Sequence, residues 1–295
     1  MEREVEEAYM PFGTAKTYYR IVHPNGKKDP LIFLHGGPGS THNYFESFDE
    51  LAEIVDRPFV MYDQIGCGLS DYSGGPELFN AETWMNELAA LREYLHLDNC
   101  HLFGQSWGGM LEIAYMIERK PKGVKSVILS STLPAAHLWK EEQFRRISYL
   151  NEEDREAFYR AEKTGDFQDP AYLEALDRFM EKYCASAPKK DDPEYMRRKK
   201  IGGRQAYVVA WGENECMPTG TLAGFDYTER LNEISVPTLI TSGQMDLCSP
   251  FIAKTMLDRL PNAQWELFQY SRHMPYIDEK EKYHDILLKW LAQFD

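Results

Sequence analysis

The hexapeptide GQSWGG at residues 104–109 constrains the fold of this chain more than any other stretch. It follows a short apolar run at residues 100–103 and precedes a helical pattern at residues 110–119, which Pro121 ends. The hexapeptide matches the pattern Gly-x-Ser-x-Gly, in which a strand turns sharply into a helix and leaves a serine at the apex in a strained backbone conformation. Glycine is expected at residues 104 and 108, the two glycines of this pattern, because neighbouring backbone comes too close for a Cβ atom. A lone Gly-x-Ser-x-Gly is a weak pattern, so the flanking strand and helix carry the prediction.

Composition excludes several classes of function. The chain has 295 residues, of which 43% are hydrophobic, and this is ordinary for a globular protein with a substantial core. Its net charge of -14 would repel phosphate backbones and anionic lipid, so neither nucleic acid nor a membrane surface is an expected partner. No apolar run approaches a membrane span, and the first residues lack the basic and apolar regions of a signal peptide.

The cysteines and histidines give no sign of a metal site. The 5 cysteines contain no Cys-x-x-Cys pair, and their odd number does not suggest a disulfide framework. The histidines show no paired ligand spacing. We therefore expect no metal and no other cofactor, and we expect a reducing cytoplasm as the location. The sequence leaves the oligomeric state open.

Short apolar runs alternate with helical patterns along most of the chain. Residues 7–12 and 17–23 predict an antiparallel hairpin joined near Gly13. Later strands are expected at residues 31–34, 59–62, 100–103, 124–129, 238–241 and 264–270, with helices at residues 83–95 and at the C-terminus. This alternation predicts an α/β fold with a mostly parallel sheet covered by helices on both faces. Ligands of such sheets gather beyond the carboxyl ends of the strands.

The block at residues 132–231 differs from the rest of the chain. Strand-like runs vanish there, and charged helical patterns that carry aromatic residues replace them. We expect this block to be a helical cap inserted into one sheet domain, formed by residues 1–131 and 232–295. Within the cap, residues 187–200 contain two prolines and a basic run, which predicts a solvated connection between helices.

Ser106, Asp246 and His273 form a candidate catalytic triad. A serine hydroxyl is a poor nucleophile near neutral pH unless a base accepts its proton and a third group orients that base. A fold with this serine turn requires the chain order Ser, then Asp or Glu, then His, and each of the three residues follows a predicted strand. Of the 8 histidines, His273 is the one in a loop after a late strand, and no other carboxylate sits as well after the penultimate strand as Asp246.

Acyl transfer also needs N–H donors aimed at the oxygen that becomes negative in the tetrahedral intermediate. The amide of Trp107 is one candidate, because it follows the serine at the start of a helix. The loop HGGPG at residues 35–39 supplies the other, with Gly37 as the candidate donor.

These motifs together resemble those of proline iminopeptidases, the prolyl aminopeptidase group of α/β-hydrolase serine peptidases. The resemblance covers nearly the whole chain and rests on residues 35–39, 63–70 (DQIGCGLS), 104–109, 211–215 (WGENE), 242–250 and 273–275. It implies an α/β-hydrolase fold with a helical cap over the active site. It also implies release of an N-terminal residue, preferably proline, from short peptides or amides that have a free N-terminus.

The resemblance also implies how the amino terminus is held. In that family a cap glutamate in a segment similar to WGENE holds the free amine; by matching, this is Glu215, with Tyr207 in the same pocket and Glu213 as a weaker candidate. An amine about 4 Å from a carboxylate, at an effective dielectric constant near 20, gains on the order of 4 kcal/mol before desolvation is subtracted. Some relatives carry an acidic residue directly after the triad aspartate, where this chain has Leu247. Amine recognition is therefore expected to depend more heavily on Glu215.

Three functions are compatible with the motifs. The first is a serine aminopeptidase that acts through an acyl-enzyme intermediate. The second is an amino-acid amidase or esterase that uses the same machinery with broader acyl specificity. The third, a ligand-binding protein on a hydrolase scaffold, is disfavoured because no triad position is substituted. Epoxide hydrolase and dehalogenase chemistry would require a carboxylate where the turn presents Ser106.

Overall fold

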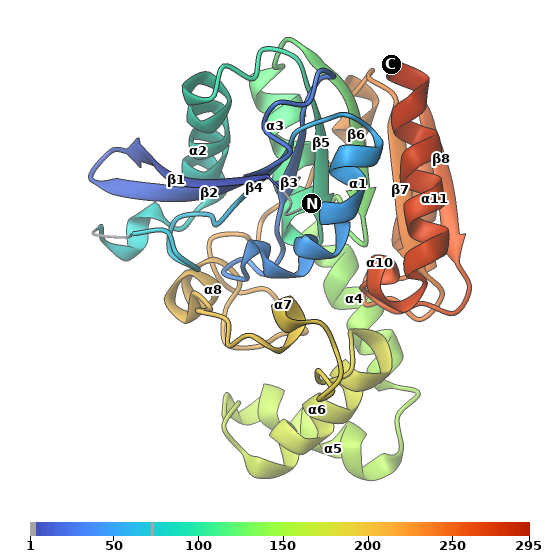
Figure 1. Cartoon of the computed structure of the whole chain (residues 1–295). Helices are drawn as coiled ribbons and strands as arrows, with labels where there is room; N and C mark the ends of the chain where they lie inside the picture. The colour runs from blue at the N-terminus through green and yellow to red at the C-terminus, as the bar shows by residue number, and fades with distance from the viewer. Residues whose placement is uncertain (1–3, 72–73) are drawn as a thin grey trace.

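The computed structural model describes residues 4–71 and 74–295, and in these residues eight strands form one sheet in the order β1-β2-β4-β3-β5-β6-β7-β8 (Figure 1). The hairpin strands β1 (Val5–Phe12) and β2 (Ala15–Val22) pair antiparallel, and β2 pairs antiparallel with β4. All other pairs are parallel. The predicted hairpin and the mostly parallel α/β sheet are confirmed. We predict that the N-terminal stretch is not a signal peptide. Residues 1–3 of this stretch lie outside the described residues.

The central strands are short and almost wholly buried, as expected for parallel strands covered on both faces. Their bounds are β3 (Leu31–Leu34), β4 (Phe59–Tyr62), β5 (Cys100–Gln105), β6 (Val124–Ser130) and β7 (Thr238–Gly243). The edge strand β8 (Ala263–Phe268) is partly exposed along most of its length. Neighbouring residues of a strand face opposite sides of the sheet. On β3, accordingly, Ile32 and Leu34 join one hydrophobic core, whereas Leu31 and Phe33 join another.

Helices cover each of these cores. The first core receives α2 (Ala81–Tyr94), α3 (Trp107–Arg119) and α9 (Pro250–Leu257). The second core receives α1 (Asp49–Ile54), α10 (Pro275–Asp278) and α11 (Lys280–Leu291). Single-turn and 3-10 segments are η1 (His42–Phe48), η2 (Pro76–Leu78), η3 (Thr228–Glu233) and η4 (Ala292–Phe294). Among the described residues, none of the helices has the length and apolar character that a bilayer crossing requires.

The segment between β6 and β7 is built from helices. They are α4 (Ala136–Ile147), α5 (Glu152–Thr164), α6 (Pro170–Tyr183), α7 (Glu194–Arg197) and α8 (Arg204–Ala210). In Figure 1, α5 and α6 lie beyond the sheet, at the bottom of the view. Phe158 of α5 packs edge-on against Tyr172 and Phe179 of α6, with ring centroids 5.4 and 5.6 Å apart. The helical character of the predicted cap is thus observed, whereas its bounds at residues 132–231 stay a prediction.

Candidate active site

The turn between β5 and α3 presents Ser106 in a strained conformation. Its φ is 55° and its ψ is -121°, a region that costs a non-glycine residue on the order of 1–3 kcal/mol. A Cβ atom at Gly108 would lie 1.9 Å from the carbonyl oxygen of Leu34, and one at Gly104 would lie 2.5 Å from the carbonyl oxygen of Gly108. The two glycines therefore allow the strand and the helix to meet backbone against backbone, and this close contact holds Ser106 at the apex.

Asp246 and His273 meet at the same edge of the sheet. Asp246 follows β7, and its Oδ1 lies 2.7 Å from Nδ1 of His273, which follows β8. The backbone N–H of Cys248 donates to the same Oδ1 at 2.8 Å, and the N–H of Gly243 donates to Oδ2 at 3.1 Å. Asp246 is fully buried, so these donors and the imidazole fix its orientation. A proton on Nδ1 of His273 leaves the lone pair on Nε2, the nitrogen that can act as a base.

Ser106 and His273 line one pocket with a volume of about 230 Å³. The side-chain amide of Gln105 donates to the carbonyl oxygen of His273 at 3.4 Å, which ties the histidine loop to the end of β5. Within residues 4–71 and 74–295, Ser106 makes no side-chain hydrogen bond to His273. In free enzymes this catalytic contact is often long, and it tightens when substrate binds.

Both candidate oxyanion donors border the pocket. The amide of Trp107 lies in the first turn of α3, where N–H groups have no acceptor within the helix. Gly37 has a φ of 112°, which glycine adopts readily. In the part of the chain that the structure describes, neither amide has a protein acceptor, whereas the amide of Gly36 donates to the Tyr44 hydroxyl at 2.6 Å. Two N–H groups thus remain available to an oxygen of the substrate.

The helical segment contributes a carboxylate to the pocket. The Tyr207 hydroxyl donates a short hydrogen bond to Oε2 of Glu215. The indole N–H groups of Trp139 and Trp211 both donate to the Glu215 carbonyl oxygen, at 2.9 and 3.0 Å. Burial raises the pKa of the Glu215 carboxyl, and the Tyr207 hydrogen bond and the nearby His273 act in the opposite direction. Two donors therefore hold the Glu215 carbonyl oxygen, and the residue lines the pocket.

Comparisons with known proteins identify the family of the chain. The sequence model of the alpha/beta hydrolase fold family matches residues 29–280. The chain is 60% identical over 294 residues to a proline iminopeptidase of Clostridioides difficile (strain 630), in an alignment that covers 99% of this chain and 100% of the relative. The chain belongs to the proline iminopeptidase family. It is also 55% identical over 293 residues to a proline iminopeptidase of Clostridium botulinum, with 99% and 100% of the two chains covered.

Solved structures share the fold of this chain. The crystal structure of VinJ superposes with a TM-score of 0.87 at 28% identity, and that of the proline iminopeptidase of Mycobacterium smegmatis with a TM-score of 0.86 at 26% identity. Each match covers 98% of this chain and 98% of the other. The α/β-hydrolase fold and the family expected from the motifs are thus confirmed.

Glu213 and Leu247, which the sequence singled out, occupy different surroundings in this iminopeptidase-family chain. Glu213 lies outside the pocket and pairs with Arg204 at 2.6 Å on the surface. Leu247, directly after Asp246, lines the pocket and is buried. Its carbonyl oxygen accepts from Arg146 at 2.7 Å. The position after Asp246 therefore supplies an apolar wall and no charge.

Sequence reasoning missed several residues that line the pocket. The Trp139 ring lies 6.5 Å from the His273 ring, and Met180 and Cys184 of the helical segment also border the space. The Lys200 ammonium lies 5.3 Å from the centroid of the Tyr44 ring at the same pocket. In the sequence these residues belong to helical stripes or to a basic run. Neither pattern distinguishes a side chain that faces a pocket from one that packs on a helix or faces solvent.

Proposed function

We propose that this chain is a prolyl aminopeptidase that releases an N-terminal residue, preferably proline, from short peptides or amides with a free N-terminus. The observation that carries the proposal is that Glu215 lines one small pocket together with Ser106 and with His273, whose Nδ1 lies 2.7 Å from Asp246. A carboxylate that holds the amine beside the serine sets the first carbonyl group of the peptide against the nucleophile. The proline iminopeptidases that match over the whole chain support the same activity.

The mechanism follows from the placement of these groups. The Ser106 hydroxyl attacks the carbonyl carbon of the N-terminal residue while Nε2 of His273 accepts its proton, and Asp246 stabilises the imidazolium. The amides of Gly37 and Trp107 bind the negative oxygen of the tetrahedral intermediate. His273 then returns the proton to the leaving nitrogen, the C–N bond breaks, and a peptide one residue shorter leaves. Water attacks the remaining ester with the same base and restores the serine.

An amidase or esterase of broader acyl specificity would use the same serine and histidine. It would have no use for Glu215, because a carboxylate in a pocket loses hydration that the hydrogen bond from Tyr207 restores only in part and that a cationic partner offsets further. The free amine of a peptide is such a partner. The location that we propose is the cytoplasm, and the free state of Cys67, Cys100, Cys184, Cys216 and Cys248 supports it.

The proposal is tested with prolyl arylamide and its N-acetylated form. The wild-type enzyme should hydrolyse the free-amine substrate with a much higher kcat/KM than the acetylated one, since acetylation removes the charge that Glu215 binds. Ser106→Ala should lower kcat by about a millionfold, the usual cost of losing the nucleophile of a triad. Equal wild-type rates on the two substrates would favour the broader amidase or esterase instead.

A pair of carboxylate variants locates the amine site within the same experiment. Glu215→Gln should lower kcat/KM for the free-amine substrate roughly 10- to 100-fold, because a hydrogen-bonded charge interaction is worth about 1.5–3 kcal/mol. Glu213→Gln removes an exposed carboxylate two positions earlier and should change the same constant less than about twofold. The amine site lies elsewhere if the Glu215 variant keeps full activity on free amines.

A further inference from the structure

Lys200 is a cation at the pocket that the proposed chemistry does not use. Its ammonium lies over the Tyr44 ring, and both residues line the pocket of Ser106. Two of the arginines near it in the chain are paired, Arg198 with Glu46 and Arg204 with Glu213. Lys200, by contrast, forms no ion pair with a carboxylate in the described part of the chain. Its charge therefore remains available to a ligand.

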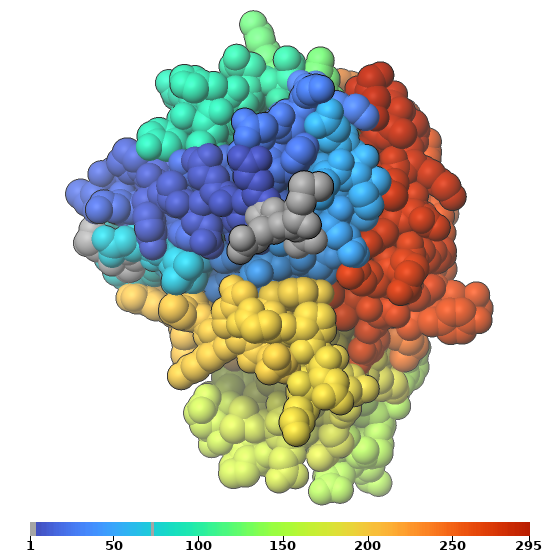
Figure 2. Space-filling view, in the orientation of Figure 1, coloured from blue at the N-terminus to red at the C-terminus, as the bar shows by residue number. Residues whose placement is uncertain are grey.

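Residues 198–203, which we name the strap, hold Lys200 against the sheet domain. The Ile201 carbonyl oxygen accepts a hydrogen bond from the N–H of Gly68, at 2.8 Å, in the loop after β4. The N–H of Gly203 donates to the carbonyl oxygen of Gly39, also at 2.8 Å, in the loop after β3. In Figure 2 the yellow surface of this part of the chain lies directly against the blue N-terminal part. The strap is thus fixed to the loops after β3 and β4, and the loop after β3 lines the pocket of Ser106.

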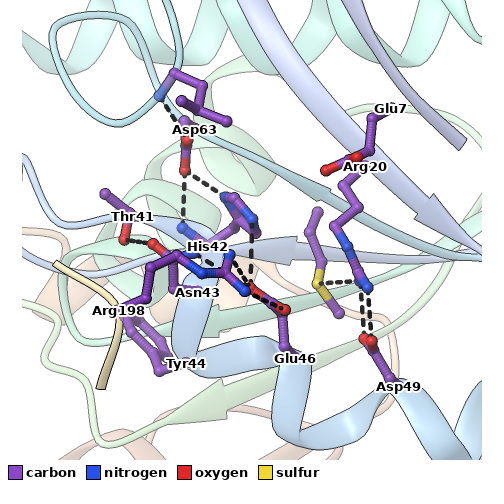
Figure 3. A network of polar contacts seen from close by, with 12 residues as sticks. Glu7, Arg20, Thr41, His42, Asn43, Tyr44, Glu46, Asp49, Asp63 and Arg198 are labelled. Atoms are coloured by element: carbon purple, nitrogen blue, oxygen red, sulfur yellow. Dashed lines mark hydrogen bonds and ion pairs between the residues drawn. The ribbon is translucent and has the colours of Figure 1, made fainter. Parts of the chain in front are cut away.

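The first residue of the strap is anchored by a polar network (Figure 3). Nη1 and Nη2 of Arg198 lie 3.0 and 3.3 Å from the two carboxylate oxygens of Glu46 on η1. His42 of η1 lies 3.8 Å from Glu46 through Nε2, and its Nδ1 lies 2.8 Å from Asp63. Tyr44, the ring beneath the Lys200 ammonium, belongs to the same η1. The contact of Arg198 with Glu46 and that of Lys200 with Tyr44 are both made to η1, and together they set the position of Lys200.

The residues that line the pocket consequently include two of opposite charge, Glu215 and Lys200. Glu215 suits a cationic amine, whereas Lys200 repels an amine and suits a carboxylate. The scissile amide of a dipeptide lies between an amine and a carboxylate, so a dipeptide carries a matching group for each. The volume of about 230 Å³ also suits a small substrate. Since the chain as a whole carries a charge of -14 and repels anions, a local cation is needed to attract a carboxylate.

We propose that Lys200 binds the carboxylate of the leaving residue and thereby makes the enzyme selective for dipeptides with a free C-terminus. This inference rests on the proposed aminopeptidase function and adds the recognition of the leaving side. Lys200 is thus a specificity-determining residue that contacts the substrate without taking part in proton transfer. Its contact exists before and during the reaction, so it acts on KM more than on kcat.

The test compares prolyl-alanine with prolyl-alaninamide, which differ only in the charge of the C-terminus. The wild-type enzyme should prefer prolyl-alanine by about fivefold in kcat/KM, the effect expected for an ion pair at a solvent-accessible position. In Lys200→Met the ratio of the two constants should fall to about one, mainly through a higher KM for prolyl-alanine. Lys200→Arg should retain the preference, and so should Lys199→Met, which removes the neighbouring exposed lysine outside the pocket.

Both substrates are measured on the same protein sample, so partial misfolding of a variant cancels in the ratio. A wild-type ratio near one, or a ratio that stays unchanged in Lys200→Met, overturns the inference. If the wild-type enzyme hydrolyses neither of the two substrates, the proposed function itself is overturned. Ionic strength gives a second readout, since about 1 M salt should lower the wild-type ratio and leave that of Lys200→Met unchanged.

Discussion

The carboxyl group of Glu215 is subject to opposing influences at the residue scale. Burial raises its pKa, while the hydrogen bond from Tyr207 and the proximity of His273 lower it. The net pKa is raised, so Glu215 takes up a proton at a higher pH than an ordinary glutamate does. Only the ionised form attracts an amine. As the pH falls, substrate binding should therefore weaken at a higher pH than it would with a fully hydrated glutamate.

The Tyr207 hydroxyl provides a way to test this coupling. Tyr207→Phe removes an influence that lowers the Glu215 pKa, so the pKa rises further and less carboxylate is ionised at any given acidic pH. The acid limb of the kcat/KM profile for prolyl arylamide should shift to higher pH, with the change carried by KM. Tyr172→Phe is the control, because this buried tyrosine has a hydroxyl without a hydrogen-bond partner among the described residues. An acid limb that does not move in Tyr207→Phe would contradict the assignment.

At the scale of elements, the contact between β3, β5 and α3 is the tightest feature of the site. Gly108 is the second residue of α3, and its α-carbon lies so close to the end of β3 that a methyl group has no room. Helix propensity and packing therefore make opposite predictions for an alanine at this position. Propensity alone favours alanine over glycine by about 1 kcal/mol, whereas the clash with backbone cannot be relieved by moving a side chain.

Gly108→Ala should thus destabilise the fold by more than about 3 kcal/mol or displace the serine turn and abolish activity. Urea unfolding and kcat on prolyl arylamide measure the two outcomes. Gly224→Ala is the matched control, since a Cβ atom there meets nothing within 4 Å and the backbone is not in the left-handed region. It should change the free energy of unfolding by about 0.5 kcal/mol or less. A stabilised, active Gly108→Ala protein would refute the steric account of the turn.

The elements themselves were predictable from local pattern. The apolar runs at residues 31–34 and 59–62 have the bounds of β3 and β4. β5 extends two residues beyond the predicted run, because Gln105 still pairs with Ser130 of β6 despite the glycine before it. Residues 187–200, expected to be a connection, contain the one-turn helix α7, which is too short to produce a periodic pattern.

The site was only partly predictable. Chain order and the predicted strands placed Asp246 near His273, and the structure shows their contact, although the catalytic roles of the three candidate triad residues stay predictions. Lys200 and Trp139 could not have been found in the same way. Their places at the pocket depend on contacts with Tyr44 and Glu215, which lie far from them in the chain and leave no local pattern.

On the scale of the whole molecule, buried acids make stability depend on pH. Glu87 of α2 lies inside the larger core, where it accepts hydrogen bonds from the Thr17 hydroxyl at 2.5 Å and from the N–H of Ile65 at 3.0 Å. Burial raises the pKa of Glu87 to about 8, against the opposing effect of these donors. In the unfolded chain a glutamate titrates near pH 4.3. The folded protein therefore binds this proton more tightly, and its stability falls as the pH rises between these two values.

Glu87→Gln should remove this contribution. The free energy of unfolding of the wild-type protein, measured in urea from about pH 5 to about pH 8, should fall more steeply with pH than that of the variant, by up to about 1.4 kcal/mol per pH unit. Glu82→Gln changes an exposed glutamate on the same helix and should keep the wild-type slope, which accounts for general charge repulsion. Parallel slopes for wild type and Glu87→Gln would show that Glu87 does not hold the proton.

The insertion of the helical segment between β6 and β7 has a consequence during synthesis. The ribosome makes β5 and its serine first, then all of α4 to α8, and only afterwards the strands that precede Asp246 and His273. A growing polypeptide thus carries the Ser106 hydroxyl before its proposed base and the carboxylate paired with that base have been made. On the proposed mechanism, the machinery for cutting peptides stays incomplete until β7, β8 and the residues that follow them are in place.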